Sequence, residues 1–377
     1  MTLTGLACLI DEPPAALRDR RLGLVSHPAA ILADCTHALA ALRASGLSIT
    51  TVFGPEHGWA GATADGVSVT HGRDTRSGLR VYSLYGADRE PTAEMLAEVD
   101  ALVFDMQDVG ARFYTFISTL YYVLRGAARA GKPVWVLDRP NPINGLAVEG
   151  PLVVSGHESF VGIAPIPIRH GLTMGELARF FNAHFDLGAE LTVVAMQGWR
   201  RSQWFDETGL PWVFTSPNLP QLSTAVVYPG LCLLEGTNLS IGRGTALPFE
   251  LCGAPWIDGE VLASELNALG LPGARFRPVR FAPTADRFAG QECEGVQVHV
   301  LDRLALRPVR LGLNMIATLR SLYPERVEWN AHFDRLMGGP PVREALDAGR
   351  SARDVSDAWS GAEAAFADAR AGCLLYS

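Results

Sequence analysis

The chain has 377 residues, of which 48% are hydrophobic and 19% charged, and its net charge is −8. This composition is typical of a well-packed globular enzyme, and it excludes disordered and fibrous classes. The negative charge disfavours nucleic acid and anionic membranes as partners, and no apolar run approaches the roughly 18 residues that a membrane span needs.

Strand-like and helix-like segments alternate through the first half of the chain. The strand-like segments are continuously apolar, which is typical of parallel strands covered by helices on both faces. The sequence therefore predicts an α/β domain over residues 1–205. Its expected strands are 21–26, 47–54, 78–86, 100–106, 132–138 and 190–196, and its expected helices are 33–46, 92–99, 113–131 and 173–185.

The second half, residues 206–377, differs from the first in composition and in hydrophobic periodicity. A long stretch at 211–256 is rich in Pro and Gly and has little periodicity, and such stretches in compact chains are usually functional. The segments after it predict a smaller α+β domain. We expect helices at 259–270, 311–324 and 351–372, and a strand at 295–302.

The cysteines and the single lysine narrow the chemistry. Six cysteines are scattered without a C-x-x-C pair, which indicates free thiols in a reducing compartment. The N-terminus has no basic leader, so we expect a cytoplasmic protein, or an extracellular or periplasmic one if a leader was removed. Lys132 is the only lysine, and it precedes Pro133 in a turn. This setting does not suit a Schiff base, a pyridoxal site or a P-loop.

Polar residues follow four of the predicted strands, at 26–27, 54–58, 105–110 and 138–142. In open α/β sheets the ligand lies beyond the carboxyl ends of the strands. One such loop is explained by caps and turns alone, but four together favour a functional site.

Several mechanisms lack their sequence signature. The chain has no G-x-G-x-x-G, no G-x-S-x-G and no H-E-x-x-H, which disfavours a dinucleotide, a serine hydrolase and a zinc protease. His27, His57 and Asp105 are possible metal ligands, but their spacing gives no support, and we expect no metal. Carboxylate acid–base chemistry remains.

Glu56 is the first candidate for that chemistry. It follows a buried strand and stands between glycines beside Trp59, where desolvation favours a proton donor. His57 either orients it, binds substrate, or supports the loop. Asp105 and Asp108 flank the neighbouring loop, where Asp108 alternatively caps a helix. In the same segment, Arg112 and Tyr114 are placed to hold an anionic substrate.

Long motifs run through the whole chain in one order. They are GPEHGWAG, GLRVYSLYG, DVGARFYTF, LDRPNPING, PIRHGLTMGELARFFN, SPNLP, YPGLCLLEGTNLSIGRGTALPFE and GAPW, followed by FDRLMGG and CLLYS. In these motifs the chain resembles the exo-β-N-acetylmuramidase family typified by NamZ. The resemblance implies a Rossmann-like, doubly wound, mostly parallel sheet in residues 1–205. It also implies a smaller C-terminal domain in 206–377 that closes the active-site cleft.

The implied activity is that of an exo-acting glycoside hydrolase. It releases N-acetylmuramic acid from the non-reducing ends of peptide-free peptidoglycan fragments, without a cofactor or metal. Glu56 stands at the family's proposed catalytic acid. The partners are peptidoglycan-derived saccharides, and nothing in the sequence specifies an oligomeric state.

The substrate suggests roles for further residues in the motifs. Its lactyl carboxylate needs a cation, and its ring needs aromatic platforms. A second carboxyl group is expected from Asp105, Asp108 or Glu235, of which we prefer Asp108, or the substrate's acetamido group replaces it. The cationic candidates are Arg112, Arg139, Arg169 and Arg243; the aromatic ones are Tyr114, Trp59, Tyr228 and Trp256; Asn141, Asn218 and Asn238 are further binding candidates.

Two positions depart from the family's pattern. Ala60 stands where the G-P-E-H-G motif usually continues with Phe-Arg-Gly, and Ile241 replaces an acidic residue. Both changes remove charge from predicted cleft loops. They leave two alternatives open: a hydrolase for a different amino sugar or anionic glycoside, and a non-catalytic muropeptide-binding protein.

Overall fold

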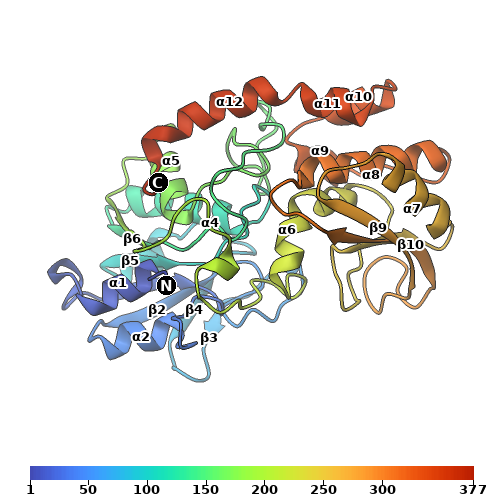
Figure 1. The fold of residues 1–377 in the computed structure, drawn as a ribbon. Coiled ribbons are helices and arrows are strands. Elements are labelled where there is room, and N and C mark those ends of the chain that lie inside the picture. Colours follow the sequence, from blue (N-terminus) through green and yellow to red (C-terminus); the bar gives the residue numbers. More distant parts are fainter.

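A seven-stranded sheet forms the centre of the N-terminal domain in the computed structural model, which describes residues 1–377 (Figure 1). Its order is β3-β4-β2-β1-β5-β6-β7, and all pairs are parallel except β3 with β4. Without β3, the chain order across the sheet is 3-2-1-4-5-6, the doubly wound order. The predicted Rossmann-like sheet is confirmed. The strands are β1 (Leu22–Ser26), β2 (Ile49–Gly54), β3 (Gly72–Arg73), β4 (Arg80–Ser83), β5 (Ala101–Asp105), β6 (Val134–Leu137) and β7 (Leu191–Val194).

Helices cover both faces of this sheet, which is why its strands are continuously apolar. α1 and α2 close a core of 15 buried residues on one face. α3, α4 and α5 lie on the other face, where a core of 74 buried residues continues into the second domain. The bounds are α1 (Gly5–Asp11), η1 (Ala15–Leu17), α2 (Ala38–Ala44), α3 (Ala93–Ala97), α4 (Phe116–Arg129), α5 (Met174–His184) and η2 (Phe205–Glu207).

Two local features differ from a simple alternation of strands and helices. The helix expected at 33–46 begins only at Ala38, because His37 accepts a hydrogen bond from the Leu39 amide as its N-cap. The connection from β2 to β4 contains no α-helix, although each of the other parallel connections does. This long loop begins at Pro55 and carries Glu56, so no helix follows directly after β2.

The second domain contains a three-stranded antiparallel sheet in the order β8-β10-β9. The helices expected at 259–270 and 311–324 and the strand at 295–302 are confirmed. The irregular stretch also holds a helix and a strand that its texture did not predict, and a further strand follows it. The elements are α6 (Leu222–Leu231), η3 (Cys232–Gly236), β8 (Leu251–Ala254), α7 (Gly259–Ala268), β9 (Ala274–Phe281), β10 (Cys293–Val300) and α8 (Pro308–Leu322).

A close crossing of α6 and α8 positions η3. A Cβ atom on Gly230 would lie 1.7 Å from the carbonyl oxygen of Pro308, and one on Gly312 would lie 2.1 Å from that of Gly230. Only glycines allow the two backbones to approach this closely. Because η3 continues directly from α6, the crossing also places Glu235.

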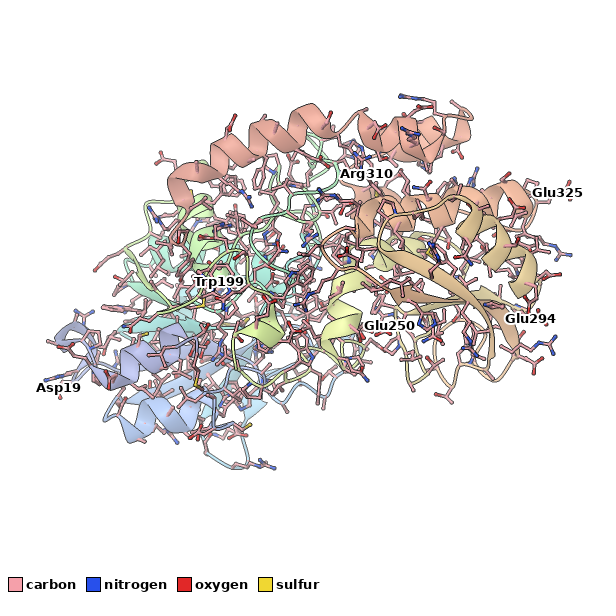
Figure 2. All side chains as sticks on the ribbon, in the orientation of Figure 1. Asp19, Trp199, Glu250, Glu294, Arg310 and Glu325 are labelled. Carbon is pink, nitrogen blue, oxygen red and sulfur yellow. The ribbon has the colours of Figure 1, made fainter.

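The C-terminal tail leaves the second domain and returns to the first (Figure 1). The helix expected at 351–372 is divided at Ala358–Trp359. Arg310, labelled in Figure 2, donates to Asp357 over 2.5 Å and so fastens the tail to α8. None of the helices is both long and apolar enough to cross a membrane. The tail comprises α9 (His332–Met337), α10 (Pro341–Asp347), α11 (Ala352–Asp357), α12 (Ser360–Ala369) and η4 (Arg370–Cys373).

Candidate active site

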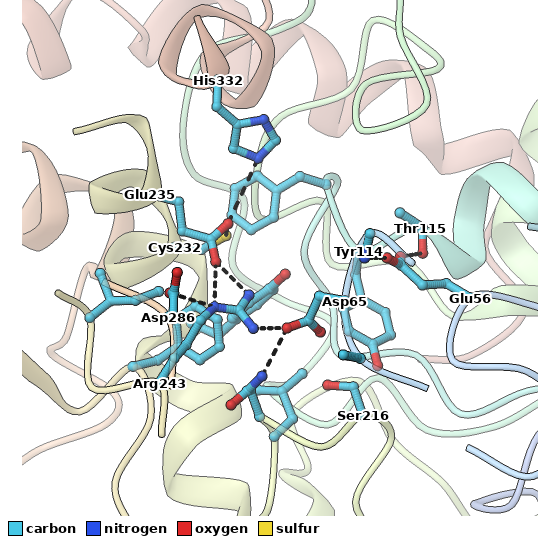
Figure 3. A pocket seen from close by; sticks show the side chains of 18 of the residues that line it. Glu56, Asp65, Tyr114, Thr115, Ser216, Cys232, Glu235, Arg243, Asp286 and His332 are labelled. Atoms are coloured by element: carbon cyan, nitrogen blue, oxygen red, sulfur yellow. Dashed lines mark hydrogen bonds and ion pairs between the residues drawn. The ribbon is translucent and has the colours of Figure 1, made fainter. Parts of the chain in front are cut away.

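A cavity of about 560 Å³ is lined by residues of both domains (Figure 3). The first domain contributes the loop after β2, including Glu56 and Asp65, and the segment before α4. The second domain contributes η3 and the loop around Arg243. The cavity therefore lies between the carboxyl end of β2 and the Pro- and Gly-rich stretch at 211–256.

Glu56 lies on the cavity wall and is half-buried. The hydroxyl of Thr115 donates to its Oε2 over 2.6 Å, and the Gly66 amide donates to its Oε1 over 3.0 Å. Thr115 is the N-cap residue of α4, yet its side chain makes no capping bond to the helix. Burial and the neighbouring Glu56 raise the pKa of Tyr85 to about 12. Glu56 thus has neutral partners and no ion pair.

His57 shapes the same loop. Its backbone has a φ of 69°, which is uncommon for a residue other than glycine. Its Nδ1 lies 2.8 Å from the Thr63 carbonyl oxygen, so Nδ1 carries a proton and donates it. Burial lowers the pKa of His57, and its Nε2 lies 3.7 Å from Asp65. The ring is therefore neutral and fixed on the cavity wall.

Arg243 occupies the middle of the cavity lining (Figure 3). Its Nε and Nη2 donate to Oε1 of Glu235 over 2.9 and 2.5 Å, and its Nη1 donates to Asp65. Asp286 is 4.0 Å away. One guanidinium is thus shared by three carboxyl groups. Burial, together with the charges of Asp286 and Glu56, raises the pKa of Glu235 to about 7.

Aromatic rings form the apolar part of the wall. Tyr114 and Tyr228, two of the aromatic candidates, line the cavity, and Tyr85, Phe113 and Phe249 lie there too. The other two aromatic candidates are elsewhere. Trp59 packs edge-on against His37 with ring centres 5.3 Å apart, and Trp256 packs against Tyr323 at 5.4 Å.

Asn218 is the one predicted asparagine on the cavity, where it donates to Asp65 over 2.9 Å. Asn141 instead donates to the Leu172 carbonyl, and Asn238 to the Arg326 carbonyl, each outside the cavity.

Asp105 and Arg139 form a buried ion pair away from the cavity. The guanidinium donates to both carboxylate oxygens over 2.5 and 2.9 Å, and also to the Ile31 carbonyl. Neither residue lines the cavity. Because the two charges neutralise each other away from the cavity, this pair stabilises the fold and does not make the predicted contact with substrate.

The arginines Arg112 and Arg169 are also outside the cavity. Arg112 is fully buried and donates to three backbone carbonyls, those of Pro151, Ile166 and Leu336. Arg169 donates to the Ile143 carbonyl. Both guanidinium groups are buried away from the cavity and donate to backbone carbonyls, so neither is available to the cavity as a carboxylate clamp.

Asp108, our preferred second carboxyl group, is buried behind the cavity wall rather than on it. It accepts a hydrogen bond from the Gly110 amide over 2.8 Å, and its carboxylate lies 3.8 Å from His170. Burial raises its pKa to about 7. It does not cap α4, whose N-cap residue is Thr115.

The two departures from the family pattern have different places. Ala60 is exposed and lies outside the cavity, whereas Ile241 is 2% exposed and lines it. The loss of a cation at position 60 therefore does not change the cavity wall. The loss of an acidic residue at position 241 makes the cavity wall more apolar.

Sequence reasoning missed several cavity residues. Tyr85 and Thr115 stand within motifs that were recognised, so their motifs were a usable signal. Asp65, Asp286 and Arg287 lie in loops without periodicity, where no local pattern marks them. The structure contains no group of three or more His, Cys, Asp or Glu side chains arranged to hold a metal ion.

A doubly wound α/β domain with a two-domain cavity lined by carboxyl groups and aromatic rings is typical of an enzyme that binds a small polar substrate. The comparison with protein families is more specific. Residues 22–223 match the N-terminal domain of exo-β-N-acetylmuramidase NamZ, and residues 226–376 match its C-terminal domain. The chain belongs to the exo-β-N-acetylmuramidase NamZ family, which confirms the resemblance seen in its motifs.

Similar proteins extend over the whole chain. Peptidoglycan β-N-acetylmuramidase NamZ of Bacillus subtilis (strain 168) is 43% identical over 99% of this chain and 91% of its own length. Two DUF1343 family proteins of Bacteroides fragilis NCTC 9343 with crystal structures each match 100% of this chain and 99% of their own. Their TM-scores are 0.93 and 0.79, at 35% and 28% identity.

Proposed function

We propose that the chain is an exo-acting β-N-acetylmuramidase that releases N-acetylmuramic acid from the non-reducing ends of peptide-free peptidoglycan fragments. The observation that carries this proposal is the placement of Glu56 in a two-domain cavity, free of any ion pair, together with a second carboxyl group, Glu235. The family membership and the named B. subtilis relative support the choice of sugar.

Glu56 acts in this proposal as the general acid that protonates the glycosidic oxygen. Thr115 holds its carboxyl group through a hydroxyl, which can donate to a carboxylate or accept from a protonated carboxyl. The same contact therefore orients Glu56 before and after it gives up its proton. A positioned acid of this kind contributes about 10²- to 10⁴-fold to the rate.

Glu235 is the second carboxyl group in this proposal, in place of Asp108. It lines the cavity, and Arg243 fixes its orientation through two hydrogen bonds. It serves as nucleophile or base, or it orients the substrate's acetamido group. Its raised pKa also suits an acid, so the roles of Glu56 and Glu235 must be separated by experiment.

The roles are separated by the leaving group. Glu56→Gln and Glu235→Gln are each assayed on N-acetylmuramyl-N-acetylglucosamine and on p-nitrophenyl β-N-acetylmuramide, whose leaving group needs no proton. We expect Glu56→Gln to lose at least about 100-fold on the disaccharide and far less on the activated substrate. Glu235→Gln loses activity on both. The opposite pattern would assign the acid to Glu235.

The sugar is tested by following the disaccharide reaction of the wild type by NMR. Release of N-acetylmuramic acid is expected, and the first-formed anomer shows whether configuration is retained or inverted. Binding without turnover would instead indicate a muropeptide-binding protein.

The cysteines bear on the compartment in which the protein works. All six are free, which supports a reducing compartment such as the cytoplasm.

A further inference from the structure

Arg287 is a cavity-lining cation whose guanidinium makes no hydrogen bond or ion pair with the rest of the protein, although its charge reaches Glu235 across the cavity. We propose that Arg287 binds the carboxylate of the lactyl ether on the terminal sugar and thereby selects N-acetylmuramic acid over N-acetylglucosamine. This inference rests on the proposed function and names the residue that recognises the negative charge of the substrate's lactyl carboxylate.

The other arginine of the cavity is not available for this task. Arg243 donates to Glu235 through two nitrogens and to Asp65 through a third. Its guanidinium also lies over the ring of Phe249, 4.9 Å from the ring centre. A substrate carboxylate would have to displace these partners, whereas Arg287 has no protein partner to displace.

The charge balance of the cavity favours an arginine without an ion-pair partner as the site for an anionic group. Four acidic residues line it, Glu56, Asp65, Glu235 and Asp286, against the two arginines. Burial lowers the pKa of both lining histidines, which are therefore neutral at pH 7. Carboxylates on this wall repel an anionic sugar, so its carboxylate is best accommodated at Arg287, the lining arginine without a direct ion-pair partner.

The loop between β9 and β10 holds Arg287 in place. Its neighbours Asp286 and Phe288 both have left-handed backbone conformations, with φ of 65° and 60°. Thr284 donates through its amide and its hydroxyl to the Gly244 carbonyl, over 2.9 and 2.7 Å. Non-glycine residues keep such conformations only when the surrounding structure enforces them. The loop is thus built against the Arg243 segment, with Arg287 on the cavity side.

Guanidinium is the cation best matched to a carboxylate, because two parallel N–H groups can meet its two oxygens. N-acetylmuramic acid differs from N-acetylglucosamine by the lactyl ether that carries this carboxylate. A stem peptide attached there converts the carboxylate to a neutral amide. Arg287 therefore also favours fragments from which the peptide has been removed.

The test compares two chromogenic substrates, the β-N-acetylmuramide and the β-N-acetylglucosaminide. We expect Arg287→Ala to lower kcat/KM for the muramide by about 10- to 100-fold, the range for a hydrogen bond to a charged group, and to leave the glucosaminide within about twofold. Arg287→Lys should fall between. Arg280→Ala, on the same hairpin but outside the cavity and paired with Glu294, is the matched control and should change neither. Equal losses on both substrates, or no loss on the muramide, would overturn the proposal.

Calorimetric binding keeps this test separate from the proposed function. If the wild type cleaves no muramide, the proposed function fails, but the affinities of free N-acetylmuramic acid and N-acetylglucosamine still report on Arg287. We expect the wild type to bind the acidic sugar more tightly and Arg287→Ala to lose that difference. Equal affinities in the wild type, or an unchanged difference in the variant, would refute the role of Arg287.

Discussion

Carboxylates stand at the carboxyl ends of β2 and β5, the two strands on either side of β1, yet they have opposite surroundings. After β2, Glu56 has a hydroxyl and one amide as partners and lies on the cavity. Asp105, the last residue of β5, forms a buried pair with the guanidinium of Arg139. The first carboxyl group is left with neutral partners, and the second is neutralised by its own chain.

This difference explains where the site lies. In doubly wound sheets the ligand usually binds where the strand order reverses, here between β1 and β5. Arg139 fills that position with Asp105 and the Ile31 carbonyl. The cavity has moved to the end of β2, where the connection to β4 lacks an α-helix and the second domain closes over it.

Asp105→Asn should separate the two carboxylates most clearly. The change leaves Arg139 buried without a counter-charge, and breaking a buried pair in this way costs about 3–5 kcal/mol of unfolding free energy. Urea unfolding measures the loss. Glu56→Gln should keep nearly the wild-type stability while it loses turnover.

The control for this prediction is Asp100→Asn, in the exposed pair with Arg21. Water screens that pair, so its loss should change the unfolding free energy far less. If Asp105→Asn unfolds like the wild type but loses turnover, Asp105 would belong to the chemistry after all.

Asp108→Asn tests a carboxyl group that has no cationic partner and does not line the cavity. Its pKa is raised from 3.8 to about 7, so between these pH values the folded state keeps a proton that the unfolded chain releases. The stability contributed by this group is complete below about pH 4 and is lost as pH rises through 7. Unfolding free energies at pH 5 and pH 8 measure it.

The asparagine variant cannot titrate at this position. Its stability should therefore fall less from pH 5 to pH 8 than that of the wild type, by on the order of 1–4 kcal/mol. Because Asp108 lies behind the wall, the pH profile of kcat should stay in place. A shifted profile with an unchanged stability difference would instead support the catalytic role that the sequence suggested.

Tyr376→Phe examines the strand end after β6. The Tyr376 hydroxyl donates to Asp138 over 2.5 Å, and Thr173 and the Gly175 amide donate to the same carboxylate. The variant loses this hydrogen bond to a charged group and also the one that the hydroxyl accepts from the Met196 amide. The unfolding free energy should therefore fall by at least about 1.5–3 kcal/mol. The kcat/KM should be unchanged, since Tyr376 is remote from the cavity. A loss of turnover at full stability would mean that the tail contributes to the site.

The fold was predictable where burial alone shapes the sequence. Strands covered on both faces are continuously apolar, so the order of the large sheet's elements was visible. β9 was not, because it alternates buried and exposed residues and contains Arg275, Arg277 and Pro278. Pro229 and Gly230 inside α6 likewise disguised a helix whose close contact with α8 requires the glycine.

The site was predictable only in part, for a related reason. Glu56 and Glu235 stand in recognisable motifs, and both lie on the cavity. The same kind of motif also pointed to Arg112 and Arg139, because a sequence does not show which carbonyls or carboxylates already occupy an arginine. Arg287 illustrates the converse: its value comes from lacking partners, and that depends on residues distant in the chain.

Ala60→Arg, which restores the cation of the family's motif, should have the smallest effect. Position 60 is exposed and outside the cavity, so a guanidinium there is hydrated and screened. We expect kcat/KM for the muramide to change by less than about twofold, as for other surface substitutions, in contrast to the loss at Arg287. Steady-state kinetics at low and high salt measure it. A tenfold gain that disappears at high salt would contradict this expectation. It would show that the loop after β2 brings residue 60 close enough to act on the substrate.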